Sequence, residues 1–81
     1  MSKHLRSLRH KALVAALIAA RERTGMSQRE LARRLQRAHS FVGKIESAER
    51  QLDVLEFCEY AEILGADATT LLRQVLKEKR Q

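Results

Sequence analysis

Apolar residues recur at intervals of three and four along most of the chain, which is the spacing of one face of an α-helix. This pattern predicts five amphipathic helices that are joined by short polar connections and pack around one core. No proline interrupts the pattern, and the helix-favouring residues Ala, Leu, Arg and Glu dominate the sequence. The expected helices run from about Ser7 to Thr24, Gln28 to Leu35, His39 to Ser47, Asp53 to Gly65 and Ala68 to Lys79.

Polar residues and glycines mark the ends of these helices. Ser27 precedes Glu30 by three residues, so its hydroxyl can accept from the Glu30 amide while the Glu30 carboxylate accepts from the Ser27 amide. Asp53 and Glu56 repeat this capping-box spacing. Gly25 suits the left-handed residue that ends the helix before Ser27. The other expected ends are Asp67, which caps the last helix, and Gly65, which ends the fourth.

The apolar face of each helix supplies the expected core. On the fourth helix, Cys58 falls on the apolar stripe and is expected to be a small buried side chain. Glu56, Glu59 and Glu62 then fall on an acidic stripe that faces solvent. The expected core residues of the first four helices are Leu13, Val14, Leu17, Ile18, Leu31, Ala32, Leu35, Ala38, Val42, Ile45, Val54, Phe57, Ala61 and Leu64.

Positive charge is concentrated in the N-terminal part of the chain. The net charge is +6, yet residues 1–50 carry twelve Lys and Arg against four Glu, and residues 51–81 carry four against six acidic residues. A basic face of this kind predicts an anionic partner, nucleic acid first and a membrane surface second. We expect residues 1–6 to form a flexible basic arm, which either lies along DNA or is disordered.

The length and the cysteine count limit the class of protein. Eighty-one residues make one small domain, 1–81, near the lower size limit for a core that folds without disulfides or metal. Cys58 is the single cysteine, so an internal disulfide is impossible and the chain fits a reducing compartment. The sequence has no Cys and His cluster with zinc spacing, no catalytic Ser, His and Asp set and no glycine-rich phosphate loop. It therefore predicts a non-enzymatic domain without metal or cofactor.

The N-terminal residues also resemble a secretory signal peptide, because the charged segment MSKHLRSLRHK precedes the apolar run ALVAALIAA. Cleavage after this run would remove the helix on which Leu31 and Leu35 pack, so we favour a helix of the domain. No run approaches the about 20 apolar residues of a transmembrane helix. A basic amphipathic helix of the membrane-surface type is contradicted by Gly25 and Ser27, which end one helix and begin another.

The second and third expected helices are joined by the tripeptide QRA, and their apolar positions have the spacing of a helix-turn-helix. Ala32 lies where the two helices cross, and a larger side chain there would push them apart. The segment SQRELARRLQRAHSFVGKIESAERQLDVLEFCEYAEILG resembles the Cro and phage-repressor (XRE-type) helix-turn-helix family, and the resemblance spans about residues 13–76. The residues that match in register are Gln28, Leu31, Ala32, Leu35, Ser40, Val42, Lys44, Ile45 and Glu46.

This resemblance implies an all-α, lambda-repressor-like DNA-binding domain of five helices. Residues 39–47 would enter the DNA major groove, and residues 28–35 would lie across the backbone. Gln28 would bind a phosphate, and Arg50, just past the third helix, is a further phosphate candidate. Phe41 would either touch a thymine methyl or pack against the second helix. The residues placed to read base edges are His39, Ser40, Gly43 and Lys44.

Arg29, Arg33 and Arg37 are spaced four apart on the second helix and just beyond it. Such a like-charge row weakens an isolated helix by a few tenths of a kcal/mol per pair. Arg34 alone is expected to have an intrahelical partner, Glu30. The unpaired row is explained if DNA phosphates lie opposite, since each neutralised phosphate releases counterions. The alternative is an ordinary solvated charged face.

Two residues depart from the family pattern, and one pair follows it. Gln36 stands where the family has glycine, and a left-handed conformation there costs about 1–2 kcal/mol, so the turn is either reshaped or strained. Ala38 occupies the usual Ser/Thr cap position, which costs about 1 kcal/mol. For Arg21 and Glu46, the resemblance implies a buried salt bridge that orients the third helix. The alternative is two independent surface charges.

The resemblance implies a transcription regulator in a bacterial or phage setting, and we expect a cytoplasmic, nucleoid-associated repressor. We expect a homodimer on a two-fold symmetric operator, with half-sites about 34 Å apart or a multiple of that. The apolar residues of the last helix exceed what one side of a small core needs, which is the basis for the dimer. The expected dimer-interface residues are Leu71, Leu72, Val75 and Leu76.

A second function class stays open. The same fold serves as the antitoxin half of toxin–antitoxin pairs and in other protein-interaction modules. In that case a toxin or another partner protein would dock on the fourth or fifth helix. Salt dependence separates the two classes, because DNA binding weakens steeply as salt rises.

Overall fold

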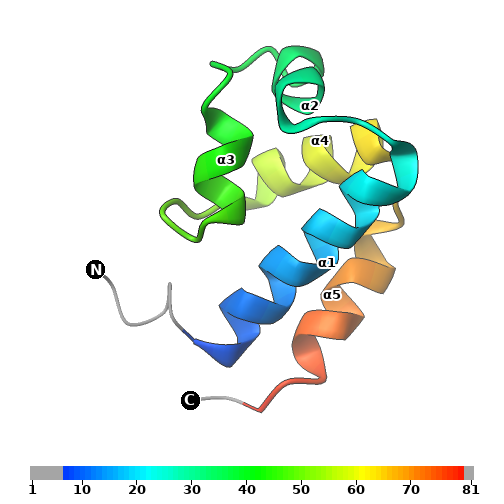
Figure 1. Ribbon diagram of the computed structural model, residues 1–81. Coiled ribbons are helices and arrows are strands. Elements are labelled where there is room, and N and C mark those ends of the chain that lie inside the picture. The colour runs from blue at the N-terminus through cyan, green and yellow to red at the C-terminus, as the bar shows by residue number, and fades with distance from the viewer. Residues whose placement is uncertain (1–6, 80–81) are drawn as a thin grey trace.

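The computed structural model describes residues 7–79, in which all regular secondary structure is α-helical. It forms α1 (Leu8–Thr24), α2 (Gln28–Arg34), α3 (Phe41–Glu46), α4 (Val54–Leu64) and α5 (Ala68–Leu76) (Figure 1). The expected all-α class with five helices is confirmed for the described residues. The basic arm expected at residues 1–6 lies outside them.

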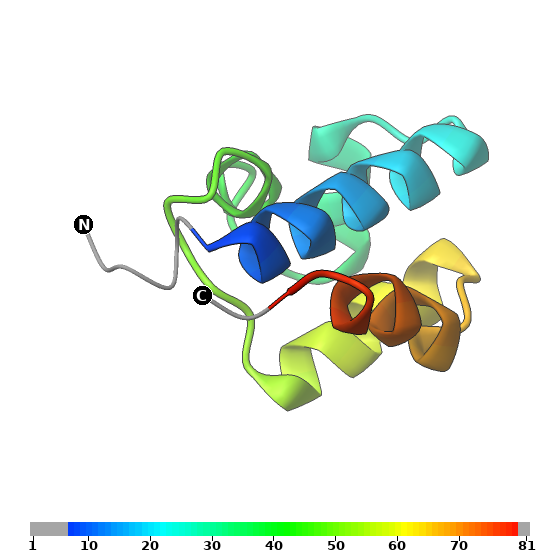
Figure 2. The same cartoon turned by 90° about the horizontal axis from the view of Figure 1, so that it is seen from below.

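The five helices surround one core, to which each contributes a fully or almost fully buried side chain. α1 is the longest helix and lies beside α5 in both views (Figures 1 and 2). α2 and α3 pack on each other at one end of the molecule, and α4 contacts both α1 and α5. The central side chains are Leu17 of α1, Leu31 of α2, Val42 of α3, Tyr60 of α4 and Leu71 of α5.

Most helix ends follow from the local sequence. The Ser27 hydroxyl accepts from the Glu30 amide, and Asp53 with Glu56 forms a complete capping box. Gly25 ends α1 in the left-handed conformation, with φ of 78°. At Ser27 the reciprocal half of the expected capping box is absent from the described contacts, because the Glu30 carboxylate accepts from arginine side chains instead. Asp67 caps α5 and Gly65 ends α4, as expected.

The third helix begins later than the sequence predicts. Ser40 is its N-cap residue and makes no side-chain capping bond, so His39 precedes the helix rather than opening it. Gln36 adopts the left-handed conformation, with φ of 60°, so the strained turn is the alternative that the structure shows. Ala48, after the helix, does the same with φ of 63°, which the sequence analysis missed. A non-glycine residue in this region costs about 1–2 kcal/mol, so α3 is held between two strained turns.

The buried face of α4 differs from the expected one. Val54 is 75% exposed and Cys58 is also exposed, so both core assignments are wrong. Glu56, expected on the solvent-facing acidic stripe, is buried at 8% exposure. The inward residues of α4 include Glu56, Phe57, Tyr60 and Ala61, spaced by three and four. Tyr60 is the large core side chain that the analysis overlooked. Ala38, expected in the core, is exposed as well.

The hydroxyl of Tyr60 is buried, and within residues 7–79 it has no hydrogen-bond partner. Burial raises the pKa of Tyr60. An unpartnered buried hydroxyl costs free energy without a compensating bond. We therefore expect Tyr60→Phe to leave the free energy of unfolding unchanged or to raise it by up to about 1 kcal/mol. Urea unfolding followed by circular dichroism measures this change.

The matched control is Tyr60→Ala, which removes the ring and opens a cavity. It should cost about 3–5 kcal/mol. A comparable loss for Tyr60→Phe would contradict the prediction, because it would show that the hydroxyl has a stabilising partner.

Candidate nucleic-acid interface

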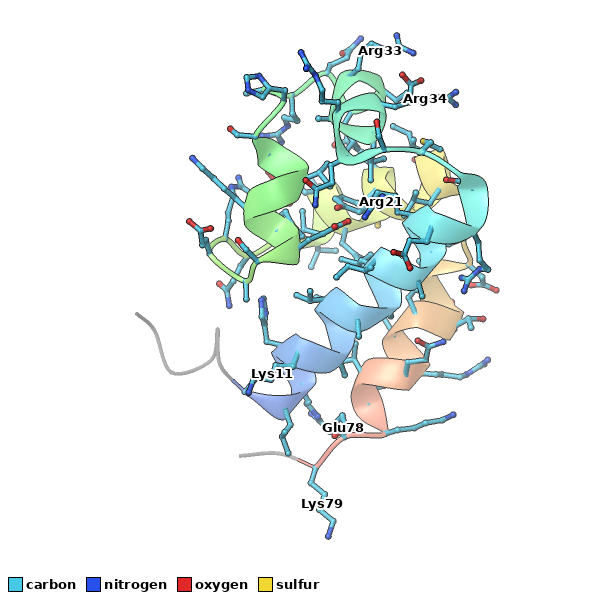
Figure 3. All side chains as sticks on the ribbon, in the orientation of Figure 1. Lys11, Arg21, Arg33, Arg34, Glu78 and Lys79 are labelled. Atoms are coloured by element: carbon cyan, nitrogen blue, oxygen red, sulfur yellow. The ribbon has the colours of Figure 1, made fainter. Side chains whose placement is uncertain are left out.

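A bidentate ion pair between Arg21 and Glu46 joins α1 to α3. The Arg21 Nε donates to Glu46 Oε2 at 2.7 Å, and its Nη2 donates to Glu46 Oε1 at 3.0 Å. The side chains of Arg21 and Glu46 are 14% and 6% exposed. In Figure 3, Arg21 lies in the space enclosed by α1, α2 and α3. The salt bridge expected from the sequence is therefore present, and the alternative of two surface charges is wrong. The hydrogen bond to Glu46 raises the pKa of Arg21.

The same carboxylate also holds the start of α2. The Gln28 Nε2 donates to Glu46 Oε1 at 2.8 Å, and the Arg21 Nη1 donates to the Met26 carbonyl at 2.9 Å. A Cβ at Gly43 would lie 3.3 Å from the Gln28 Oε1. The glycine thus leaves room for the Gln28 amide against α3. Three helices are fixed around one carboxylate, while the expected phosphate contact of Gln28 stays a prediction.

The outer face of α2 carries fewer free arginines than the sequence suggests. The Arg33 Nη2 and the Arg34 Nε both donate to Glu30 Oε2, at 2.7 and 2.8 Å. Both arginines project from the outer end of α2 (Figure 3). Hydrogen bonds from Arg33 first and Arg34 second lower the pKa of Glu30 to about 2. The Glu30 carboxylate accepts hydrogen bonds from the arginines three and four positions ahead. The expectation that Arg34 is its sole partner is therefore wrong.

Arg37 is also paired, so the predicted unpaired row reduces to Arg29 among the described residues. The Arg37 Nη2 donates to Glu56 Oε2 at 2.7 Å. Arg29, Arg33 and Arg37 nevertheless line one open cleft together with His39. This cleft is basic even after its ion pairs are counted, since Glu30 is the single acidic residue among those that line it.

The expected base-reading side chains lie together at the start of α3 and along it. His39 and Ser40 are exposed and immediately precede the helix, and Lys44 is exposed one turn further on. Gly43 is partly exposed between them. Ser40, Gly43 and Lys44 are spaced by three and four residues, so they fall on one side of the helix, and His39 adjoins Ser40. Their contacts with DNA stay predictions.

A cluster around Phe41 was missed by the sequence analysis. Phe41 is buried at 8% exposure, which favours the packing alternative over a contact with a thymine methyl. The guanidinium carbons of Arg37 and Arg50 each lie 4.8 Å from the centre of its ring, a cation–π distance. Arg50 also donates to both carboxylate oxygens of Glu56 at 3.0 Å. The capping-box spacing identified Glu56 as a helix-start residue, but no local signal links it to Arg37.

The exposed apolar surface expected on α5 is present, and the apolar groove beside it is also lined by residues of α1 and α4. Leu71 is 2% exposed and belongs to the core, so its assignment to a dimer interface is wrong. Leu72 and Leu76 are 47% and 62% exposed, and Val75 is partly exposed. Leu72 and Val75 line an apolar groove whose other members are Leu13, Leu52, Asp53, Val54 and Phe57.

The comparisons with known proteins agree with this arrangement. A family model described as a helix-turn-helix domain matches residues 1–74. An XRE-family-like protein from Pseudomonas syringae is 45% identical, with a TM-score of 0.79, and the match covers 85% of this chain and 84% of that one. The chain belongs to the XRE-type helix-turn-helix family. Among curated protein sequences, none matches the chain.

Two structures of the clp gene regulator ClgR from Corynebacterium glutamicum are more distant relatives of this XRE-type domain. Each is 24% identical, with TM-scores of 0.76 and 0.77, and each match covers 86% of this chain. The matches cover 91% and 74% of the two ClgR chains. At this identity the likeness shows the shared fold. The XRE-type domain thus shares its fold with a protein described as a gene regulator. No helix within residues 7–79 has the length and apolar character needed to cross a membrane.

The Glu56 cluster predicts a pH dependence of stability. Hydrogen bonds from Arg50 and then from the Asp53 amide lower the pKa of Glu56 from 4.5 to about 2. A group whose pKa is lowered on folding stabilises the protein above its unfolded pKa and loses that contribution as the pH falls to the folded pKa. We expect wild type to be more stable than Glu56→Gln above pH 4.5, with the difference shrinking between pH 4.5 and about 2.

Urea unfolding of both proteins between pH 7 and pH 2 measures this difference. A gap that stays constant over that range would contradict the prediction, since it would mean that the ionisation of Glu56 is not coupled to folding.

Proposed function

We propose that the chain is a sequence-specific DNA-binding transcription regulator that inserts α3 into the major groove and lays α2 across the backbone. The observation that carries this proposal is the exposure of His39 and Ser40, which immediately precede α3, and of Lys44 on α3. The orientation of this short helix is fixed by side chains of α1 and α2. The Arg21–Glu46 ion pair and the Gln28 side chain supply that fixation. The regulator would act in the cytoplasm as a repressor, by occupying an operator.

The basic side chains around α3 have the distribution that backbone contacts need. Arg29, Arg33 and Arg37 lie on the α2 side of the helix, and Arg50 follows its C-terminal end. Phosphate contacts of this kind set the register of a protein on the duplex, whereas base contacts give it sequence preference. Gln28 would add a contact at the start of α2.

Variants of single residues separate the two kinds of contact. His39→Ala and Lys44→Ala should each relax preference at one base position by about 1–3 kcal/mol. Arg29→Ala should weaken binding to all duplexes alike and reduce the salt slope by about one. Selection from random duplexes at fixed salt, followed by titrations between 50 and 200 mM salt, measures both quantities.

Arg73→Ala is the matched control for Arg29→Ala, because Arg73 is an exposed arginine on α5, away from α2 and α3. It should leave affinity and salt slope close to those of wild type. If His39→Ala and Lys44→Ala leave base preference unchanged, α3 is not the reading element. If wild type binds duplexes without salt dependence, the proposal as a whole fails.

We further propose that the regulator binds as a homodimer. The surface that supports this is the apolar patch of Val54, Leu55, Leu72 and Leu76, which are between 47% and 76% exposed. Large exposed apolar side chains that adjoin an apolar groove are typical of an interface. A symmetric dimer would cover the same patch on both copies and present two α3 helices to a palindromic operator.

The double variant Leu72→Glu/Leu76→Glu tests the dimer, because it places charge in the patch without touching the core. It should be monomeric in sedimentation velocity at concentrations where wild type is a dimer, and it should bind a two-half-site operator more weakly. The double variant Arg73→Gln/Lys77→Gln, at exposed positions of α5 and its C-cap, is the charge control, because it lowers the net charge by the same two units. A wild type that stays monomeric and binds a single half-site would contradict the dimer and favour a different protein on this patch.

A further inference from the structure

The carboxylate of Glu56 is the meeting point of two elements that flank α3. Its Oε2 accepts from the Arg37 Nη2 at 2.7 Å and from the Arg50 Nη2 at 3.0 Å. Its Oε1 accepts from the Arg50 Nη1 and from the Asp53 amide, each at 3.0 Å. Arg37 comes from the turn between α2 and α3, and Arg50 follows α3. One carboxylate therefore joins both connections of that helix to the start of α4.

The two arginines are ordered but still accessible. Their side chains are 39% and 38% exposed, whereas that of Glu56 is 10% exposed. Both guanidinium groups donate to the same oxygen and both lie at 4.8 Å from the centre of the Phe41 ring, so they are neighbours. Within the described contacts, Arg37 donates to Glu56 through Nη2, which leaves Nε and Nη1 for an outside acceptor.

We propose that Glu56 is a positioning residue for DNA binding, which holds Arg37 and Arg50 together as a paired clamp for backbone phosphate beside α3. This inference rests on the proposed function and adds a role for an acidic residue within it. The two arginines outnumber the Glu56 carboxylate that holds them, although the neighbouring Asp53 carboxylate also acts on Arg50. An arginine that is already fixed by an ion pair and a ring loses less side-chain entropy when it binds phosphate.

Simple electrostatics predicts the opposite effect of this carboxylate. An acidic group near a DNA-binding surface repels phosphate, so its removal should raise affinity. Positioning predicts that its removal lowers affinity, because the two guanidinium groups lose their common acceptor. The sign of the change therefore decides between the two roles.

Glu56→Gln and Glu59→Gln form a matched pair for this test. Both remove one negative charge from α4, but Glu59 is exposed and makes no ion pair among the described residues. We expect Glu56→Gln to bind duplex DNA about tenfold more weakly at fixed salt, as expected when two side chains lose their order. Its base preference should be unchanged, and Glu59→Gln should bind as tightly as wild type or more tightly.

Glu56→Asp provides a second, charge-conserving variant. It keeps the negative charge but shortens the side chain by one methylene. If the carboxylate acted only by neutralising positive charge on Arg37 and Arg50, the affinity for DNA would be unchanged in this variant. We expect weaker binding, uniform across sequences, in a variant whose circular dichroism and urea unfolding show that it is folded at the assay temperature.

The outcomes are distinguishable from a failure of the proposed function. If wild type does not bind duplex DNA, both proposals fail. If wild type binds and Glu56→Gln binds equally well or more tightly, as does Glu56→Asp, the positioning role alone is overturned. Loss of affinity in both Glu56 variants, with Glu59→Gln unaffected, supports it.

Discussion

The direction of α3 depends on one buried ion pair. A helix of six residues has little stability of its own, so its orientation is set by what it packs against. Val42 and Ile45 fix its depth in the core, and Glu46 fixes its rotation by its two bonds to Arg21. A buried ion pair of this kind fixes the orientation of the helix and adds little net stability. The loss of one partner would leave a buried charge uncompensated and cost about 3–5 kcal/mol of stability. The exposed residues of α3 share one surface because this pair holds the helix.

Acidic residues organise the basic side of the molecule. Glu30, Glu46 and Glu56 each accept from more than one side chain, and together they hold Arg21, Arg33, Arg34, Arg37 and Arg50. Each pairing lowers the local positive charge but fixes a long side chain that would otherwise lose entropy on binding. The surface that faces DNA in our proposal is therefore less charged and more ordered than the count of arginines suggests.

Local signals in the sequence predicted the positions and caps of the helices. Tertiary contacts determine which residues of α4 are buried and which distant side chains form ion pairs. The caps at Ser27 and Asp53 and the left-handed Gly25 depend on neighbours within a few residues, so they could be read directly. The buried face of α4 could not, because Val54 and Cys58 are as apolar as the residues that the core selects. The resemblance to a known family supplied the Arg21–Glu46 pair. Nothing comparable pointed to Arg37 and Glu56, which are 19 residues apart and meet only in the folded chain.

In the proposed binding mode, the shortness of α3 limits how many base pairs one copy of the protein can read. Six residues at 1.5 Å rise extend for about 9 Å, which is roughly three base-pair steps of 3.4 Å. The left-handed residue Ala48, two positions after Glu46, prevents the extension of α3 at its C-terminal end. A given sequence of three base pairs recurs roughly every sixty positions in random DNA. A genome offers at least about 10⁶ competing sites, so such a short sequence occurs in it many times. Specific binding to one genomic site in this mode would therefore require a second recognition helix or a sequence-dependent bend in the duplex.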